Sequence, residues 1–173
     1  NISCGTCSFC VSGRKNFCKN WKALGVTLPG GFSEYITAPE KNIFDIGSLA
    51  FEKASLMEPL SCVLHGLGKL SLTKNSTAFI AGMGPIGILI LRVLKYRGIR
   101  VICGETSEHR KNLAEQCGAD AVHDTSGMFE EVLSRYPDLF DAVIDATGIP
   151  AVMEKLIELA APGGNILLFG VAP

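Results

Sequence analysis

The chain has 173 residues, of which 47% are apolar and 8% aromatic, and its formal net charge is −1 at pH 7. This composition supplies enough apolar side chains for one buried core, or for one core with part of a second. The balanced charge argues against a nucleic-acid-binding surface and a polybasic membrane segment. The longest apolar run, 86–91, contains Gly87 and is too short to cross a bilayer. We therefore expect neither nucleic acid nor membrane as a partner.

The start of the chain and its cysteines suggest its context. The first residue is Asn1 rather than Met, three positions before a cysteine cluster, so we expect an internal piece of a longer protein. No secretory signal pattern is present. The seven cysteines form one tight cluster and three scattered sites in apolar surroundings, which is unlike a disulfide framework. This pattern predicts a reducing, cytoplasmic compartment.

Four cysteines near the start have the spacing C-x2-C-x2-C-x7-C: Cys4, Cys7, Cys10 and Cys18. A structural zinc ion needs four thiolates, each at about 2.3 Å. The short gaps let one loop present three sulfurs, and the longer gap lets the chain return with the fourth. An iron–sulfur cluster is the alternative, but bacterial ferredoxins place the last cysteine after three residues and follow it with proline. We therefore predict one bound zinc.

Residues 1–60 form a region with few regular patterns, rich in Gly, Pro, Asn and Ser. Residues 32–38 alternate apolar and polar side chains after a Pro-Gly-Gly turn signal, which predicts a strand with one buried face. Residues 43–46 read as a second short strand.

From about residue 70 the pattern changes to alternating strands and helices. Buried strands are predicted at 77–81, 100–103, 119–122, 140–145 and 166–169. The helices between them are predicted from Pro85 to a cap at Gly98, from Ser107 to Gly118 with Leu113, Ala114 and Cys117 facing inward, around 128–136, and from Pro150 to 162–164. This alternation predicts an α/β fold with a doubly wound parallel sheet.

A glycine-rich signature follows the first of these strands and opens the first of these helices: Gly82, Met83, Gly84, Pro85, Ile86 and Gly87. Glycines let such a turn tighten and let the backbone approach a pyrophosphate, while the helix N-terminus supplies free N–H groups. The alternative is a glycine turn in an α/β domain that binds no nucleotide. Because strand, turn and helix occur in the required order, we predict dinucleotide binding.

Glu105 closes the second strand, 18 residues after Gly87. An acid at this place accepts a hydrogen bond from the adenosine ribose of NAD and repels the 2′-phosphate of NADP. Arg110 weakens that preference, because a nearby cation tolerates a phosphate; the alternative for Glu105 is an ordinary surface acid. Thr147 and Val171 follow strands four and five, so we expect them to border the nicotinamide half.

The motifs together resemble the zinc-containing medium-chain dehydrogenases/reductases. The matching segments are C-G-x-C-x-x-C at 4–10 with Cys18, G-G-F-S-E-Y at 30–35, E-P-L-S at 58–61, the glycine signature, G-A-D at 118–120 and D-x-T-G at 145–148. The resemblance covers essentially the whole chain. It implies part of a GroES-like, mostly β catalytic domain with a zinc lobe over residues 1–60, and a Rossmann dinucleotide-binding domain over 61–173 that lacks its C-terminal end.

The resemblance implies two zinc ions, a structural one on the four cysteines and a catalytic one. The usual Cys and His ligands of the catalytic ion would precede residue 1. Glu58 occupies a position that is an acid in the polyol branch, so it is expected in the shell of the catalytic zinc. The alternative is a capping role, since an acid is favoured at a helix N-terminus.

The implied activity is hydride transfer between an alcohol or polyol and NAD, in a homo-oligomer, a dimer or tetramer, of the full-length protein. An L-threonine 3-dehydrogenase-like enzyme is an alternative. A second is a dinucleotide-binding module without turnover, serving as a redox sensor. A third is a zinc-free reductase of the same superfamily, but such relatives usually lack the four-cysteine lobe.

Overall fold

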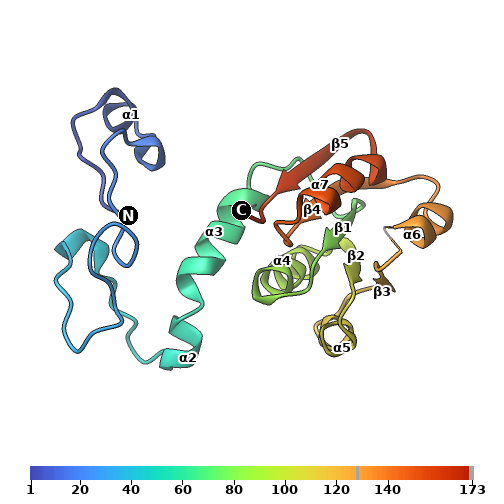
Figure 1. The fold of residues 1–173 in the computed structure, drawn as a ribbon, viewed down its shortest axis with the longest axis horizontal. Coiled ribbons are helices and arrows are strands. Elements are labelled where there is room, and N and C mark those ends of the chain that lie inside the picture. The colour runs from blue at the N-terminus through green and yellow to red at the C-terminus, as the bar shows by residue number, and fades with distance from the viewer. Residues whose placement is uncertain (128, 172–173) are drawn as a thin grey trace. The chain divides into compact units, whose positions relative to one another are not determined.

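The computed structural model describes residues 1–127 and 129–171, and the chain divides into two compact units, Asn1–Ala54 and Ser55–Pro173 (Figure 1). The first unit contains only short helices: α1 (Ser8–Val11), η1 (Lys15–Phe17), η2 (Glu40–Asn42) and α2 (Phe51–Ala54). Two isolated bridges, Ile2 with Lys22 and Leu24 with Leu28, hold its backbone together.

The two strands predicted in this unit are wrong for the described residues, because neither 32–38 nor 43–46 forms a strand. Phe32 and Tyr35, which would lie on opposite faces of such a strand, are both exposed, at 112% and 91%, so neither face is buried as predicted. A strand satisfies its backbone groups only by pairing with another strand. The described chain offers these segments no partner, so the pattern alone does not produce the strand.

The second unit is built on a five-stranded sheet in the order β3-β2-β1-β4-β5, with every neighbouring pair parallel. The strands are β1 (Thr77–Ala81), β2 (Arg100–Glu105), β3 (Ala121–Asp124), β4 (Phe140–Asp145) and β5 (Ala160–Leu168). The helices are α3 (Met57–Leu67), α4 (Pro85–Tyr96), α5 (Glu108–Gln116), α6 (Glu130–Arg135), α7 (Pro150–Leu156) and the short η3 (Ile157–Leu159).

Helices cover both faces of the sheet (Figure 1). One apolar core joins the sheet to α3, α4 and α5, and includes the fully buried Leu67, Ile80 and Leu94. A second core joins the opposite face to α6 and α7 around Phe79 and Phe140, whose ring centroids lie 5.3 Å apart. Buried residues in both layers make this the predicted doubly wound α/β fold. Each helix among the described residues is too short or too polar to span a bilayer.

The predicted elements differ from the structure mainly at their ends. Leu113, predicted to face inward, is 37% exposed, whereas its neighbour Ala114 is fully buried. The helix predicted to reach residue 162 ends at Leu156, and β5 already begins at Ala160. Part of the helix predicted around 128–136 lies outside the described residues, since residue 128 is not described.

The strand order creates a switch point beside β1. The chain runs outward from β1 through β2 to β3 and then returns to place β4 on the other side of β1. Loops after β1 and β4 therefore leave the sheet side by side, and the Ala146 N–H donates to the Ala81 carbonyl at 2.9 Å. Open α/β sheets bind their ligands at such a point, beyond the carboxyl ends of the strands.

Candidate functional site

The four predicted cysteine ligands converge in the first unit. Their Sγ atoms all lie within 4.8 Å of one another, and the pairs Cys7–Cys10, Cys4–Cys10 and Cys7–Cys18 are separated by 3.5, 3.9 and 4.0 Å. Four thiolates at about 2.3 Å around a tetrahedral zinc ion would stand about 3.8 Å apart. The geometry therefore fits one zinc ion held by all four sulfurs.

Local backbone structure prepares these sulfurs for a metal. The N–H of Cys7 donates to Cys4 Sγ at 3.4 Å, and the N–H of Cys4 donates to Cys18 Sγ at 3.3 Å. Backbone N–H groups of Thr6 and Cys7 lower the pKa of Cys4 to about 6. Burial instead raises the pKa of Cys10 to about 11, so this thiol must lose its proton when a metal binds.

The glycine turn between β1 and α4 shows why its glycines differ in role. Gly82 has a φ of +90°, and a side chain there would also meet Thr147 Cγ2 at 2.7 Å. A Cβ at Gly87 would overlap the Gly82 carbonyl. Gly84 has an ordinary φ of −69°, and a Cβ there would meet no atom within 4 Å. Gly82 and Gly87 are therefore explained by protein contacts, whereas Gly84 leaves open space for a ligand.

Helix α4 begins at this turn with its donors free. Gly84 is the N-cap and Pro85 the first helical residue, which suits a position whose N–H has no helical partner. The first bond into the helix runs from the Ile88 N–H to the Gly84 carbonyl, at 3.0 Å. The N–H groups of Ile86 and Gly87 therefore precede the helical hydrogen bonds and are available to an anion such as a pyrophosphate.

Glu105 is a buried acid, only 6% exposed, that links two loops. Its Oε1 accepts the Thr106 and Ser107 N–H groups at 2.8 and 3.0 Å, and its Oε2 accepts the Met83 N–H at 2.8 Å. Burial opposes ionisation, but these N–H donors and the nearby Arg110 outweigh it, so the Glu105 pKa lies below its usual value. Oε2 keeps a lone pair for a further donor such as a ribose hydroxyl.

A cavity of about 260 Å³ lies at the switch point, beyond the carboxyl ends of β1 to β4. It brings together five of the predicted site residues: Gly82, Gly84, Glu105, Arg110 and Thr147. The other predicted cofactor residues do not line it. Pro85 lines an adjoining apolar hollow, Ile86 and Gly87 lie in the first turn of α4, and Val171 is 91% exposed.

Several cavity residues were missed by the sequence analysis. Thr125 and Phe129, on the segment after β3, line the cavity, as do Thr106 and the apolar Ile149 and Val152. The available signal was positional, since a residue just beyond the carboxyl end of a parallel strand is a candidate in this kind of fold. The order of the strands, which decides whose loops meet, is visible only in the structure.

The loop after β4 is fixed by a fully buried acid, Asp145. Its Oδ1 accepts the Thr147 N–H at 2.9 Å and the Thr147 hydroxyl at 2.6 Å, and its Oδ2 accepts the Gly148 N–H at 3.1 Å. The Thr147 Oγ1 in turn accepts the Ile149 N–H at 3.0 Å. The D-x-T-G motif thus holds the cavity wall opposite Glu105, and the Thr147 hydroxyl is engaged within the protein.

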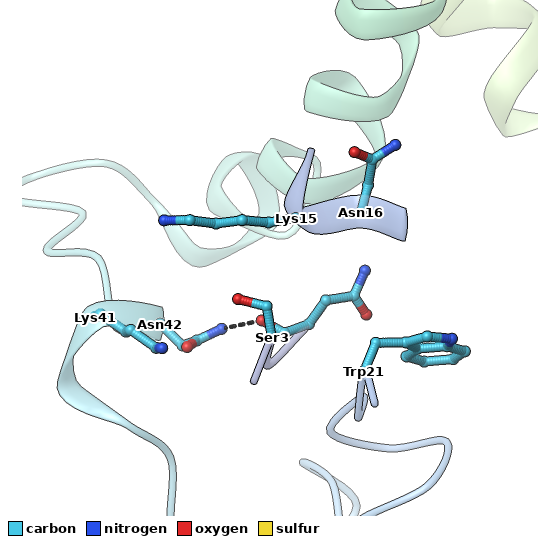
Figure 2. Close-up of a pocket in the computed structure, with 7 residues that line it drawn as sticks. Ser3, Lys15, Asn16, Trp21, Lys41 and Asn42 are labelled. Carbon is cyan, nitrogen blue, oxygen red and sulfur yellow. Dashed lines mark hydrogen bonds between the residues drawn. The ribbon is translucent and has the colours of Figure 1, made fainter. Parts of the chain in front are cut away.

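A larger hollow, of about 650 Å³, lies in the first unit and contains none of the predicted site residues (Figure 2). Figure 2 shows Lys15, Asn16, Trp21 and Lys41 around it. The Asn42 side-chain amide donates to the Asn1 carbonyl at 2.9 Å. The hollow has no paired acid and base and no thiol.

Two family models match the chain. Residues 85–173 match the model described as zinc-binding dehydrogenase, and residues 1–48 match the alcohol dehydrogenase GroES-like domain. The chain belongs to the zinc-binding dehydrogenase family. The first match covers α4 and the strands β2 to β5, and the second covers the four-cysteine cluster.

Individual dehydrogenases are similar to the chain along its whole length. D-altritol 5-dehydrogenase of Agrobacterium fabrum is 39% identical over 99% of the chain, and L-threonine 3-dehydrogenase of Idiomarina loihiensis is 30% identical over 100%. The chain spans only about half of these relatives, 51% and 52% of their lengths.

Two solved structures that are similar to the chain contain a cofactor. A protein of Sinorhizobium meliloti classed as a zinc-binding dehydrogenase, solved with NADP, has a TM-score of 0.93 at 34% identity. An Escherichia coli protein named short chain alcohol dehydrogenase, solved with NADH, has a TM-score of 0.90 at 34% identity. These matches include 99% and 98% of the chain, but only 52% and 51% of the lengths of the two neighbours.

The residues described here do not by themselves form a second zinc site of this family. The four cysteines are the only group of three or more candidate ligands found among them. Glu58 lies inside the first turn of α3, where the following Pro59 is tolerated because its missing N–H needs no hydrogen-bond partner. Its Oε1 accepts the exposed Cys62 thiol at 3.4 Å. One acid is too few, since a catalytic zinc takes about three protein ligands.

Proposed function

We propose that the chain is the part of a zinc- and NAD-dependent dehydrogenase that holds the structural zinc and binds the adenosine and pyrophosphate of the cofactor. We further propose that the full-length protein oxidises an alcohol group of a polyol. The observation that carries this proposal is the cavity at the switch point, where Glu105 faces a glycine turn whose Gly84 leaves room for a ligand.

The residues of the chain would divide the work of binding. The free N–H groups at the start of α4 would receive the pyrophosphate, and Glu105 Oε2 would accept a ribose hydroxyl. The buried Asp145 fixes the loop that carries Thr147 and so holds the opposite wall in place. Bound NAD supplies the hydride acceptor, and the protein contributes position and exclusion of water.

A preference for NAD over NADP follows from Glu105, whose lowered pKa keeps it ionised at neutral pH. Titrating the chain with both cofactors tests it. We expect tighter binding of NAD, and Glu105→Ser should narrow the difference in binding free energy by about 1.5–3 kcal/mol, the range for a hydrogen bond to a charged group. Equal or tighter binding of NADP to the unmutated chain would contradict the preference, and Arg110, 3.8 Å from Glu105, would then be the residue to substitute.

A polyol substrate is favoured by similarity, since the altritol enzyme is 39% identical. L-threonine is the second candidate, because several L-threonine 3-dehydrogenases are 30–32% identical over the whole chain. Assaying the full-length protein with NAD against a panel of sugar alcohols and against L-threonine distinguishes the two. Turnover with neither, despite NAD binding and two bound zinc ions, would favour a binding module without catalysis.

Glu58 is proposed to belong to the shell of the catalytic zinc in the full-length enzyme. Glu58→Ala should then lower turnover far more than NAD affinity, and Glu52→Ala, an acid in the first turn of another helix, is the matched control. Unchanged turnover would favour a helix-capping role. The isolated chain should bind cofactor but catalyse nothing, since one acid cannot hold the ion.

The cellular setting and assembly are further proposals. All seven cysteines are free thiols in the structure, which supports a reducing compartment such as the cytoplasm. A homo-oligomer, a dimer or tetramer, remains a prediction for the full-length protein, and sedimentation of that protein tests it.

A further inference from the structure

A buried histidine outside the cavity joins two elements of the second unit. His123 lies on β3 and is 5% exposed. Its Nε2 is 3.0 Å from the Tyr136 hydroxyl, and its Nδ1 is 3.4 Å from Glu131 Oε1. The Tyr136 ring meets the imidazole edge-on, at 5.5 Å between centroids.

These contacts give each ring nitrogen of His123 a partner, and Glu131 Oε1 also pairs with Arg135 Nη2 at 3.2 Å. Nδ1–H would donate to the Glu131 carboxylate, and Nε2 would accept the Tyr136 O–H. Glu131 lies in the first turn of α6, and Tyr136 directly follows that helix. The three side chains therefore tie both ends of α6 to the end of β3. We call this group, Glu131, His123 and Tyr136, the clasp.

The clasp joins the two elements, β3 and α6, on either side of the segment that forms one wall of the cavity. Between β3 and α6 lie Thr125 and Phe129, and both line the cavity. The Thr125 methyl lies against β2, where a Cβ on Gly104 would meet it at 2.6 Å. Asp124 Oδ1 accepts the Ser126 N–H at 2.9 Å and so holds the start of the segment. Phe129, at its other end, directly precedes α6.

Phe129 itself has a strained backbone conformation. It has a φ of +72°, a conformation unfavourable for a bulky side chain, yet it is only 3% exposed. Its ring packs edge-on against Phe79 at 5.5 Å, and its carbonyl accepts the Leu133 N–H at 2.9 Å as α6 begins. Such backbone persists only where its surroundings fix it. The clasp anchors the helix that begins at this residue.

We propose that Glu131, His123 and Tyr136 are positioning residues for cofactor binding, which hold Thr125 and Phe129 as the wall beside the adenosine half. The proposal rests on the proposed dinucleotide binding at this cavity. It assigns a binding role to side chains that touch no ligand, since none of the three lines the cavity. Removing a contact of the clasp should therefore weaken the binding of ligands that contain adenosine.

The test measures binding of ADP-ribose, which has the adenosine half and the pyrophosphate but no nicotinamide, to the 173-residue chain by calorimetry. Tyr136→Phe removes one hydroxyl and keeps the ring, and Glu131→Ala removes the carboxylate. Each should weaken ADP-ribose binding by about threefold to tenfold, as expected for losing one hydrogen bond that holds the wall. Glu131→Gln keeps an acceptor and should restore most of the affinity.

A stability control separates positioning from general destabilisation. Leu159 is fully buried in the apolar core that also contains Phe129, but it does not line the cavity. Leu159→Ala should lower the unfolding midpoint more than Tyr136→Phe and leave ADP-ribose affinity unchanged. Hydrogen exchange adds a second readout, in which ADP-ribose slows exchange at the Leu133 amide in the unmutated chain and less in the clasp variants.

The outcomes distinguish the two proposals. If clasp variants bind ADP-ribose like the unmutated chain, or if Leu159→Ala loses as much affinity as they do, the positioning role is wrong and dinucleotide binding stands. If the unmutated chain itself binds no ADP-ribose, the proposed function fails and the positioning role fails with it.

Discussion

The two units of this chain are stabilised in different ways. In residues 1–54 the only buried hydrophobic residues are Cys10, Cys18 and Ala23, and two of these belong to the thiol cluster. In the second unit, two apolar cores cover both faces of the sheet. A region without a core of its own depends on a metal to order it, whereas the sheet can fold from apolar burial. The zinc lobe and the cofactor domain should therefore fail separately.

Removing one sulfur is the strongest test of that separation. Cys7→Ser leaves three thiolates, so bound zinc should fall from about one ion per chain to nearly none, because structural sites need all four ligands. Amides of residues 1–25 should then exchange freely while those of β1 and β4 stay protected. Elemental analysis and hydrogen exchange measure this.

Cys62→Ser is the matched control, since this exposed thiol lies outside the cluster and should leave the zinc in place. Iron in the purified chain, or a protected first unit without any metal, would contradict the assignment.

The converse experiment disrupts the second unit. Ile80 is fully buried in the central strand, so Ile80→Ala should lower the free energy of unfolding by about 2–5 kcal/mol. NAD binding should weaken with it, while zinc content stays unchanged. Denaturant titration and elemental analysis give the two readings, and Leu168→Ala, at a 55% exposed position, is the mild control. Loss of bound zinc together with destabilisation of the sheet would show that the stabilities of the two units depend on each other.

Within the second unit, two glycines should respond in opposite ways. Gly87→Ala forces a methyl against the Gly82 carbonyl and should cost about 1–3 kcal/mol of stability. Gly84→Ala points a methyl into open space and should change stability by less than about 1 kcal/mol. It should nevertheless weaken NAD binding, because that space is proposed for the pyrophosphate. An unchanged dissociation constant for Gly84→Ala would place the cofactor elsewhere.

The smallest expected effect is a pH dependence from Glu105. Its pKa in the folded chain lies below the unfolded value of about 4.3, so the unfolded state binds more protons as the pH falls. The stabilisation is therefore complete above that value and is lost as the pH drops through the folded pKa. Glu105→Gln should reduce the loss of folding stability at acidic pH and lower the free energy of unfolding at pH 7 by about 1 kcal/mol. Unfolding free energies from pH 3 to 7 measure it, and an unchanged slope would contradict it.

The strand core was predictable because its signals are local. β1 and β4 have the predicted bounds, and α4 starts at Pro85 as expected. The start of β5 was not predictable, because Pro162 and two glycines read as the end of a helix. In the structure they lie in a strand at the edge of the described sheet, where the pairing with β4 shifts register and proline is tolerated.

Spacing within one short segment was enough to predict the four-sulfur cluster, the glycine turn and the acid at the end of β2. Which loops meet depends instead on the arrangement of the strands, which places Glu105 within reach of the Met83 N–H and brings Thr125 and Phe129 to the same cavity. That arrangement also leaves 32–38 without a partner strand among the described residues. Strand order and pairing join residues far apart in the chain, and no local pattern encodes which strand lies beside which.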